Sequence, residues 1–291
     1  MLKNPVNRIR LSLPLFLLLL FFGQQYSIAD EKKTIRFGVL SIAQPARIFA
    51  NWQPFADYMS QQLGQPVEIV VPRGFGKMKK TISEGKVDFF YINSLVFYRL
   101  KQEGKAVAVA QMLNIAGQTT SRSDIFVKRD SGIDNIDDLK DKNIAYVSPM
   151  GAGGYLAPRA FLYEFGLESG IETRESFTKN LSNTIHGVLL GDYDAGTMCG
   201  VNYKLMSKKI ETGELKVIAI SEEYPENVIG ARSNLPEKQV QQFHDALLNM
   251  TETTEGKTVL QDMQKMKIKT FIEYDEAMEA ITERLLKTGK L

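Results

Sequence analysis

Short apolar runs alternate with amphipathic stretches along this chain, a pattern typical of β-strands separated by α-helices. In the first part of the chain the apolar runs predict strands at residues 34–40, 66–71, 87–92 and 106–112, with intervening helices that end near residues 63 and 85. The run at 87–92 is nearly all apolar, as expected of a strand buried on both faces of a sheet. This βαβαβ order predicts a parallel, doubly wound sheet.

A second unit of the same kind follows a polar stretch at residues 117–122. Its predicted elements are strands at 125–128, 143–147, 193–198, 215–220 and 227–232, a helix start at 136–139 and a long helix over about 155–165. The tail then predicts helices at 237–250, 256–266 and 275–286 around one short strand at 269–272. This tail has too little strand to form a domain alone, so we expect it to pack on the first unit.

We therefore expect an α/β protein with two doubly wound lobes joined by two crossover segments. Lobe 1 comprises residues 30–120 and 223–291, and lobe 2 comprises residues 121–222. Lobes joined by two short segments can close like a hinge around a ligand. Open α/β sheets bind ligands in the crevice beyond the carboxyl ends of their strands, so we expect the site in the cleft between the lobes.

The first 29 residues have the three-part pattern of an export signal peptide. Lys3, Arg8 and Arg10 form a basic start, residues 11–22 form an apolar core, and small residues end at Ala29. The apolar core is shorter than the stretch of about 20 residues that spans a bilayer. We therefore predict cleavage after Ala29 and a periplasmic protein; the alternative is an anchor helix that is kept.

Composition excludes several classes of function. The 291 residues include 36 Lys and Arg, 34 Asp and Glu, two His and one Cys, Cys199. The formal charge of +2 falls close to zero once the basic leader is removed, so it gives no argument for nucleic-acid binding. One cysteine makes no intramolecular disulfide, and with two histidines it does not supply a structural zinc site. We expect a monomer without a metal, a cofactor or a nucleic-acid partner.

A glycine-rich segment, Gly151-Ala152-Gly153-Gly154, lies between a predicted strand and the start of the long helix. Glycines there let backbone N–H groups approach a ligand, and the N-terminus of a helix attracts anions. The alternative is a turn whose glycines are needed only for positive φ angles. The segment lacks the Gly-Lys-Ser/Thr of a phosphate-binding P-loop.

Other candidate ligand contacts follow the first three strands of the first unit: Ser41, Gln44, Trp52, Arg73, Tyr91, Asn93 and Ser94. Asn93 and Ser94 suit a polar ligand, but they are equally suited to capping the helix that follows. Trp52 is as well suited to the core as to the wall of a ligand site. Arg73 is a candidate partner for an oxyanion, with a solvated surface arginine as the favoured alternative.

His186 and Cys199 are the residues that most resemble a catalytic pair. Nucleophilic catalysis needs a base within hydrogen-bond reach of the nucleophile and a third group that orients the base. His186 lies within a predicted helix beside apolar residues, which favours a core or surface histidine. No other nucleophile–base pair or metal set stands out, so we expect that this protein is not an enzyme.

From about residue 36 to residue 280 the chain resembles the phosphate/phosphite/phosphonate-binding family of periplasmic proteins, a branch of the type II solute-binding fold. The resemblance rests on short motifs in a fixed order: Gly38-Val39, WQPFADY (52–58), LGQPVE (63–68), GKVD (85–88), DLKDK (138–142), GYLAP (154–158), GDYDAG (191–196) and TEGK (254–257). It implies a hinged cleft, a small anionic ligand and an ABC permease as partner. A periplasmic sensor subunit that partners a membrane kinase or cyclase is the alternative.

The chain departs from the family where ligand is held. The family's Ser-Thr-Ser-Gly corresponds to the segment from Gly151 to Gly154, and its Gly-Pro after the third strand corresponds to Asn93-Ser94. A family histidine falls at Leu181, and a ligand-contacting acid falls at Cys199. We therefore predict a ligand larger or less charged than a simple phosphonate, held by backbone amides and by Tyr91, Asn93 and Tyr155.

Overall fold

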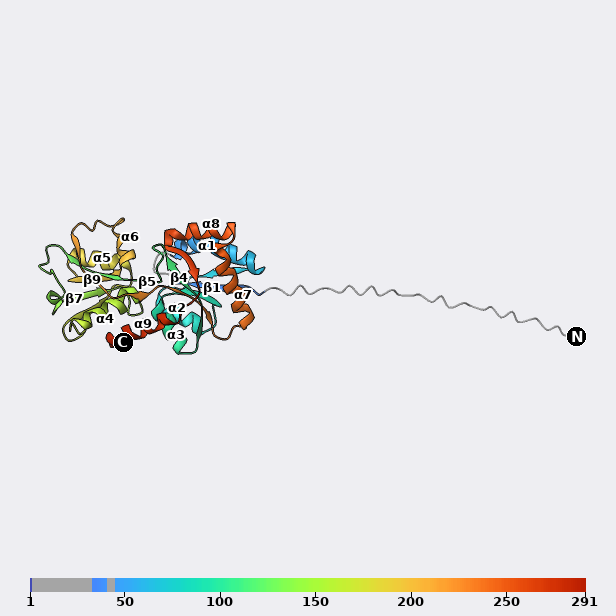
Figure 1. The fold of residues 1–291 in the computed structure, drawn as a ribbon, viewed down its shortest axis with the longest axis horizontal. Helices are drawn as coiled ribbons and strands as arrows, with labels where there is room; N and C mark the ends of the chain where they lie inside the picture. The colour runs from blue at the N-terminus through green and yellow to red at the C-terminus, as the bar shows by residue number, and fades with distance from the viewer. Residues whose placement is uncertain (2–32, 41–44) are drawn as a thin grey trace. The chain divides into compact units, whose positions relative to one another are not determined.

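The protein is described here by a computed structural model that covers Met1, residues 33–40 and residues 45–291 (Figure 1). The rest of the expected signal peptide lies outside the described residues. So do two of the candidate ligand contacts, Ser41 and Gln44. Residues 33–291 form one unit with two main sheets.

The larger sheet has six strands in the order β13-β4-β12-β3-β1-β2. They are β1 (Ile35–Val39), β2 (Val67–Val70), β3 (Phe89–Ile92), β4 (Ala106–Asn114), β12 (Val228–Arg232) and β13 (Ile268–Ile272). β1 is parallel to β2 and β3, but β12 is antiparallel to both β3 and β4, and β13 is antiparallel to β4. β1 to β4 therefore all run in the same direction, as predicted, whereas β12 and β13 run against them, so the sheet as a whole is mixed. The chain leaves at the carboxyl end of β4 and returns at that same end, so β12 must run the opposite way.

The smaller sheet has five strands in the order β10-β6-β9-β7-β8. They are β6 (Ser123–Lys128), β7 (Asn143–Tyr146), β8 (Arg174–Phe177), β9 (Ala195–Cys199) and β10 (Leu215–Ile220). β7 is parallel to β8 and β9, whereas β6 is antiparallel to β9 and to β10. β8 was not predicted because it is an edge strand without fully buried residues and therefore has no apolar run. The α/β class itself is confirmed.

Two short strands connect the sheets. β5 (Thr120–Ser121) and β11 (Tyr224–Pro225) pair in antiparallel fashion, Tyr224 opposite Ser121. We call this pair the hinge ribbon. We call the six-stranded sheet with its packed helices the first lobe, and the five-stranded sheet with its packed helices the second lobe.

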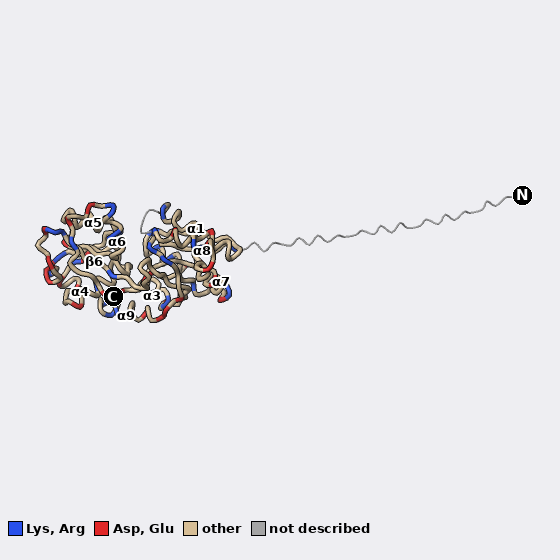
Figure 2. Tube along the Cα trace, turned by 45° about the horizontal axis from the view of Figure 1, so that its top comes forward, with Lys and Arg blue, Asp and Glu red and all other residues tan. Residues whose placement is uncertain are grey.

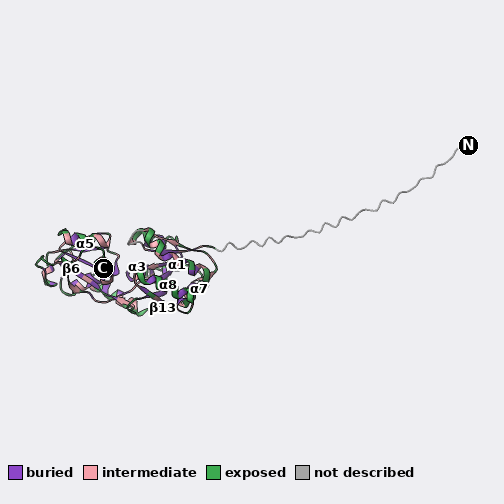
Figure 3. Cartoon of the chain, turned by 90° about the horizontal axis from the view of Figure 1, so that it is seen from above, coloured by how far each residue is buried: buried purple, intermediate pink, exposed green. Residues whose placement is uncertain are grey.

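Helices cover both faces of each sheet. In the first lobe, α1 (Pro45–Leu63), α7 (Glu237–Leu248) and α8 (Thr254–Met263) cover one face, and α2 (Phe75–Ser83) and α3 (Ser94–Gln102) cover the other. The neighbouring residues Phe89 and Phe90 serve these two faces, because successive side chains of a strand point to opposite sides. In the second lobe, α4 (Ala157–Glu164) covers one face and α5 (Leu181–Leu190) with α6 (Gly200–Met206) the other. Figure 3 shows the buried residues inside and the exposed ones outside.

The C-terminal helix α9 (Ala277–Thr288) contacts both lobes (Figure 1). Its Leu285 shares a buried cluster with Leu95 of α3 and with Ala160 of α4. Arg159 of α4 donates from Nε to the Gly289 carbonyl at 2.9 Å. α7, α8 and β13 pack within the first lobe, where the whole tail was expected, and α9 packs on α3 of that lobe and also on α4 of the second lobe.

Charged residues are distributed over both lobes. Figure 2 shows Lys and Arg positions interspersed with Asp and Glu positions along the trace. This fits the near balance of 36 basic and 34 acidic residues in the chain. Within the described residues, no helix is long and apolar enough to cross a membrane.

Candidate functional site

A cleft of about 650 Å³ lies at the carboxyl ends of strands from both lobes. Its walls come from the ends of β1, β3 and β4, from the segment after β7, from the end of β9 and from the hinge ribbon. The volume falls within the range of about 300–1,000 Å³ that is typical of small-molecule sites. The position is the one at which open α/β sheets bind their ligands.

The structure brings most of the predicted site residues to this cleft. Its lining includes Trp52, Tyr91, Asn93, Gly151, Ala152, Gly153, Gly154, Leu181 and Cys199. Arg73 is not part of that lining and is exposed, as its surface alternative predicts. Tyr155 and Ser94 do not line it either.

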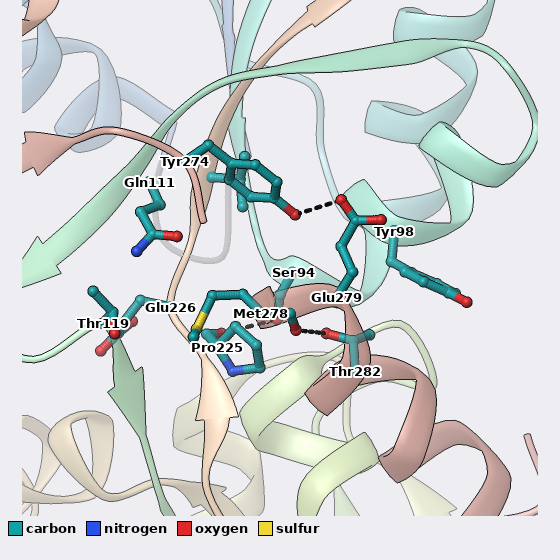
Figure 4. Close-up of a pocket in the computed structure, with 11 residues that line it drawn as sticks. Ser94, Tyr98, Gln111, Thr119, Pro225, Glu226, Tyr274, Met278, Glu279 and Thr282 are labelled. Carbon is teal, nitrogen blue, oxygen red and sulfur yellow. Dashed lines mark hydrogen bonds between the residues drawn. The ribbon is translucent and has the colours of Figure 1, made fainter. Parts of the chain in front are cut away.

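Tyr155 and Ser94 are occupied elsewhere. The ring of Tyr155 packs edge-on against Tyr146 at 5.0 Å, and its hydroxyl donates to Glu175 Oε2 at 3.2 Å. Because the helical turn begins at Ala152, the side chain at position 155 points into the second-lobe core. Ser94 donates to the Pro225 carbonyl at 2.8 Å beside a separate pocket (Figure 4). That pocket has a volume of about 10 Å³, room for about one water molecule.

The first-lobe wall of the cleft is aromatic and continuous with the core. Trp52 is 2% exposed, with ring centroids 5.5 Å from Phe37, 5.3 Å from Phe55 and 4.8 Å from Tyr91. Tyr91 donates from its hydroxyl to Met112 Sδ at 2.9 Å, and burial raises its pKa well above the ordinary value. Trp52 is thus both a core residue and part of the wall, so the two alternatives for it coincide.

Asn93 joins the two lobes at the edge of this wall. Its Oδ1 accepts from the Val96 N–H at 2.9 Å and caps α3, as the capping alternative predicts. Its Nδ2 donates to the Met150 carbonyl of the second lobe at 3.0 Å. Both polar groups of the Asn93 side chain therefore have protein partners, one in each lobe.

Part of the second-lobe wall is backbone. Residues Ala152–Leu156 form a π-helical turn that runs directly into α4, so the glycine segment is the start of a helix. Neither Gly151, Gly153 nor Gly154 has a positive φ, and the alternative of a turn that requires such angles is wrong. N–H groups in the first turn of a helix lack intrahelical acceptors, which suits a ligand with acceptor oxygens.

Two buried hydroxyl groups fix the orientation of this backbone. Ser123 of β6 donates from Oγ to the Gly153 carbonyl at 2.6 Å. Thr197 of β9 donates from Oγ1 to the Gly154 carbonyl at 3.0 Å. With their carbonyls held against the sheet, the peptide groups of the segment have a defined direction.

Cys199, Tyr224 and Leu181 also line the cleft on this side, together with residues 200–202, Lys204 and Leu205 of α6. Burial raises the pKa of the Cys199 thiol, and burial likewise raises the pKa of Tyr224. Cys199 packs against the buried cluster that contains Tyr224. His186, by contrast, is exposed on α5 and does not line the cleft, so these residues do not form the pair that nucleophilic catalysis needs.

Sequence reasoning missed the charged residues of the cleft. Its lining includes three cations and three carboxylates: Arg122, Lys204, Lys267, Asp124, Glu223 and Glu226. Most of them lie in or next to the two predicted crossover segments. Their position in these segments is the only feature of the sequence that could have indicated them. Glu226 accepts from Asn114 Nδ2 at 3.0 Å and from the Ser121 hydroxyl. Burial raises the pKa of Asp124, an effect that the charge of Lys204 opposes.

Glu223 and Arg122 form an ion pair at the cleft rim. Glu223 accepts from Thr120 Oγ1 at 3.0 Å and from Arg122 Nη2 at 3.1 Å. Among the described residues, no three His, Cys, Asp or Glu side chains are grouped so that they could hold a metal ion. The three cations and three carboxylates of the lining balance in formal charge, and amides, hydroxyls and aromatic rings line the cleft beside them.

Comparison with known proteins places these features in context. The family model described as "ABC transporter, phosphonate, periplasmic substrate-binding protein" matches residues 37–278. The phosphonates-binding periplasmic protein of Escherichia coli is 25% identical over 238 residues, which cover 80% of this chain and 70% of that protein. A solved binding-protein component of an ABC phosphonate transporter from Pseudomonas aeruginosa is 21% identical, with a TM-score of 0.75 over 89% of this chain and 87% of that one. At that identity the structural likeness establishes the fold alone.

A sensor protein is also similar. The tetrathionate sensor histidine kinase TtrS of Salmonella typhimurium is 28% identical over 149 residues. The match covers 50% of this chain and only 25% of the kinase, so it concerns one part of a much longer protein.

Proposed function

This chain belongs to the family of periplasmic substrate-binding proteins of phosphonate ABC transporters, and from that membership we propose that it captures a small ligand in its cleft and delivers it to an ABC permease. The observation that carries the proposal is the cleft of about 650 Å³, whose lining comes from both lobes and the hinge ribbon. A ligand that contacts both lobes favours the closed form. Closure then distinguishes the loaded protein from the empty one.

We propose that the ligand is larger or less charged than a simple phosphonate. Gly151, Ala152 and Gly153 offer no hydroxyls, and a hydrogen bond to a charged group contributes roughly 1.5–3 kcal/mol. Losing two such bonds removes about 3–6 kcal/mol, or roughly two to four decades of affinity. The three carboxylates of the cleft offset its three cations, so the lining has no net positive charge that would favour a compact, densely charged anion.

Calorimetry tests the nature of the ligand. Phosphate, phosphite and 2-aminoethylphosphonate should each bind no tighter than about 0.1 mM, in line with the lost contacts. Micromolar binding of any of the three would contradict this part of the proposal. It would instead favour phosphonates, the ligands named for the E. coli relative. Native mass spectrometry of protein purified from the periplasm should then identify the co-purifying compound.

Capture itself has an independent test. With the compound so identified, small-angle scattering should show a smaller radius of gyration at saturation than in its absence. An unchanged radius would contradict hinge closure. N-terminal sequencing of the same material should begin at Asp30, and full-length chain in the membrane fraction would contradict the cleaved leader.

We further propose that the protein performs no chemistry on its ligand. The family consists of binding proteins, and the exposed position of His186 leaves Cys199 without a histidine partner in the cleft. The bound compound should therefore have an unchanged mass after prolonged incubation with the protein. Appearance of a product would overturn this.

A sensory role is the second candidate, supported by the similarity to the tetrathionate sensor kinase over half of this chain. The two roles differ in partner: an importer subunit works with a permease and an ATPase, whereas a sensor subunit works with a membrane kinase or cyclase. Deleting the gene should abolish uptake of the ligand in the first case. In the second case uptake should persist and a ligand-dependent transcriptional response should be lost.

A further inference from the structure

A side chain at position 153 and the ring of Tyr224 exclude each other. A Cβ atom on Gly153 would lie 2.2 Å from Tyr224 Oη and 2.4 Å from Cζ, far closer than carbon and oxygen approach without a bond. The ring has little room to move away, because Tyr224 is 5% exposed and shares a buried cluster with Leu156 and Leu285. Gly153 lacks a positive φ, so the neighbouring phenol, rather than the backbone, requires a glycine here.

The Tyr224 hydroxyl reaches this position from the hinge ribbon. Tyr224 pairs with Ser121 across the ribbon, and Cys199 packs against the buried cluster that contains Tyr224. All three residues line the cleft, together with Gly153. A tyrosine phenol is protonated at neutral pH, and burial raises the pKa of Tyr224 further, so its hydroxyl has a proton to donate.

We propose that Tyr224 is a specificity-determining residue of the cleft, whose hydroxyl takes the place of a side chain at residue 153 and donates to an acceptor oxygen of the ligand. The proposal rests on the proposed function, since it assigns a ligand contact within the same cleft. It has a structural consequence of its own. The second-lobe wall receives its side-chain donor from the ribbon between the lobes, and a hydroxyl residue at 153 is compatible with the fold only if Tyr224 is made smaller.

A stability cycle tests the exclusion without any ligand. Gly153→Ala should lower the melting temperature by roughly 5 °C in the natural protein, because the new Cβ overlaps the phenol. In a Tyr224→Val background the same substitution should have little effect. Gly154→Ala is the matched control, because its Cβ would meet only Val147 at 3.4–3.5 Å, an ordinary contact. Equal losses for Gly153→Ala in both backgrounds would overturn the proposal.

Titration with methylphosphonate and phosphite tests the contact with ligand. The fluorescence of Trp52, the single tryptophan of the chain, reports binding because this residue lines the cleft. Tyr224→Phe removes only the hydroxyl and should weaken binding by roughly tenfold or more. Tyr274→Phe is the control: Tyr274 donates to Glu279 at 3.0 Å in the separate small pocket, and its loss should leave binding unchanged (Figure 4). Natural affinity in Tyr224→Phe would overturn the proposal.

The exchange variant Gly153→Ser with Tyr224→Val separates this proposal from the proposed function. It should bind methylphosphonate roughly tenfold tighter than Tyr224→Val alone, because a serine hydroxyl now occupies the vacated space. If the natural protein binds neither probe, the phosphonate-like ligand is contradicted, and a gain in the exchange variant still supports the role of position 153. No gain in the exchange variant overturns the proposal whatever the natural protein binds.

Discussion

The two walls of the cleft are built in different ways. The first-lobe wall consists of side chains, Trp52 and Tyr91, that belong to a continuous aromatic core. The second-lobe wall includes the backbone of residues 151–154, which is held by Ser123 and Thr197 and covered by Tyr224. Changes to the first wall should therefore appear mainly as changes in stability. Changes to the second wall should appear mainly as changes in binding.

Trp52→Ala should have the largest effect on stability. It removes a 2%-exposed ring that packs against Phe37, Phe55 and Tyr91, and such truncations cost about 3–5 kcal/mol. Urea unfolding followed by circular dichroism measures the loss. Phe49→Ala is the control on the same helix, because Phe49 is 46% exposed and should change stability by less than about 0.5 kcal/mol. Similar losses for the two variants would show that Trp52 is not part of the core.

Asp88 tests the sheet that carries the first wall. This 3%-exposed residue accepts from Arg36 Nη2 at 3.2 Å and from Arg232 Nε at 3.1 Å, so it links β1 and β12 next to β3. Burial alone would raise its pKa, but hydrogen bonds from both arginines and the charge of Arg36 outweigh burial and lower it. Asp88→Asn should cost about 2–3 kcal/mol at neutral pH, less than for a fully buried pair because Arg36 is partly exposed.

The pH dependence follows from the lowered pKa of Asp88. Its contribution is complete above the unfolded-state pKa of about 4 and is lost as the pH falls through the lower folded-state value. The difference in unfolding free energy between Asp88→Asn and the natural protein should therefore be full at pH 7 and reduced at pH 3. Asp130→Asn, which removes an exposed pair with Lys128, should cost less than about 1 kcal/mol at either pH. If the difference in unfolding free energy between Asp88→Asn and the natural protein is as large at pH 3 as at pH 7, this account is contradicted.

Ser123→Ala tests the second wall. It leaves the buried Gly153 carbonyl without its donor, which should cost about 1–2 kcal/mol of stability. The peptide group of Gly153 then loses its fixed direction. Affinity for the co-purifying ligand should therefore fall, and it should fall by more than it does in Phe49→Ala, the exposed control in the first lobe. Ser131→Ala, which removes an exposed hydroxyl bonded to the Lys128 carbonyl, should change neither property. If Ser123→Ala lowers stability but leaves affinity unchanged, changes to the second wall affect stability rather than binding, as changes to the first wall do.

Asn93→Ser should have the smallest effect. Serine still caps α3 but is too short to reach the Met150 carbonyl, so the contact between the walls is lost at a cost of about 1 kcal/mol. Small-angle scattering without ligand should show a larger radius of gyration than for the natural protein. Asn180→Ser alters a comparable cap, on α5, that has no partner across the cleft among its described contacts, and it should leave the radius unchanged. An unchanged radius in Asn93→Ser would show that this contact does not hold the edge of the cleft.

The fold was predictable because its strands are short apolar runs between amphipathic helices. The run at 87–92 became β3, and the tail helices became α7, α8 and α9 within a few residues of their expected bounds. Strand direction was not predictable, since an antiparallel β12 has the same composition as a parallel strand. The exposed edge strand β8 gave no apolar signal at all.

The site was predictable where it depends on strand ends and not where it depends on helix phase or on distant contacts. Gly151 to Gly154 lie in the cleft because they follow a strand, as expected. Tyr155 turned inward because the helix starts at Ala152. The role of Gly153 depends on Tyr224, which lies 71 positions further along the chain, and no local pattern reveals such a pair.

The central position of β12 has a consequence for how the chain acquires its structure. β12 lies between β3 and β4 in the first-lobe sheet, yet residues 228–232 follow the entire second lobe in the sequence. A chain that emerges from its N-terminus therefore presents β1 to β4 with an open gap until the last quarter has been made. The second-lobe strands, β6 to β10, are contiguous in sequence and can pair earlier. A nascent chain should thus expose the unpaired edges of β3 and β4 for a prolonged period, the interval in which a chaperone that recognises extended apolar segments would have most to bind.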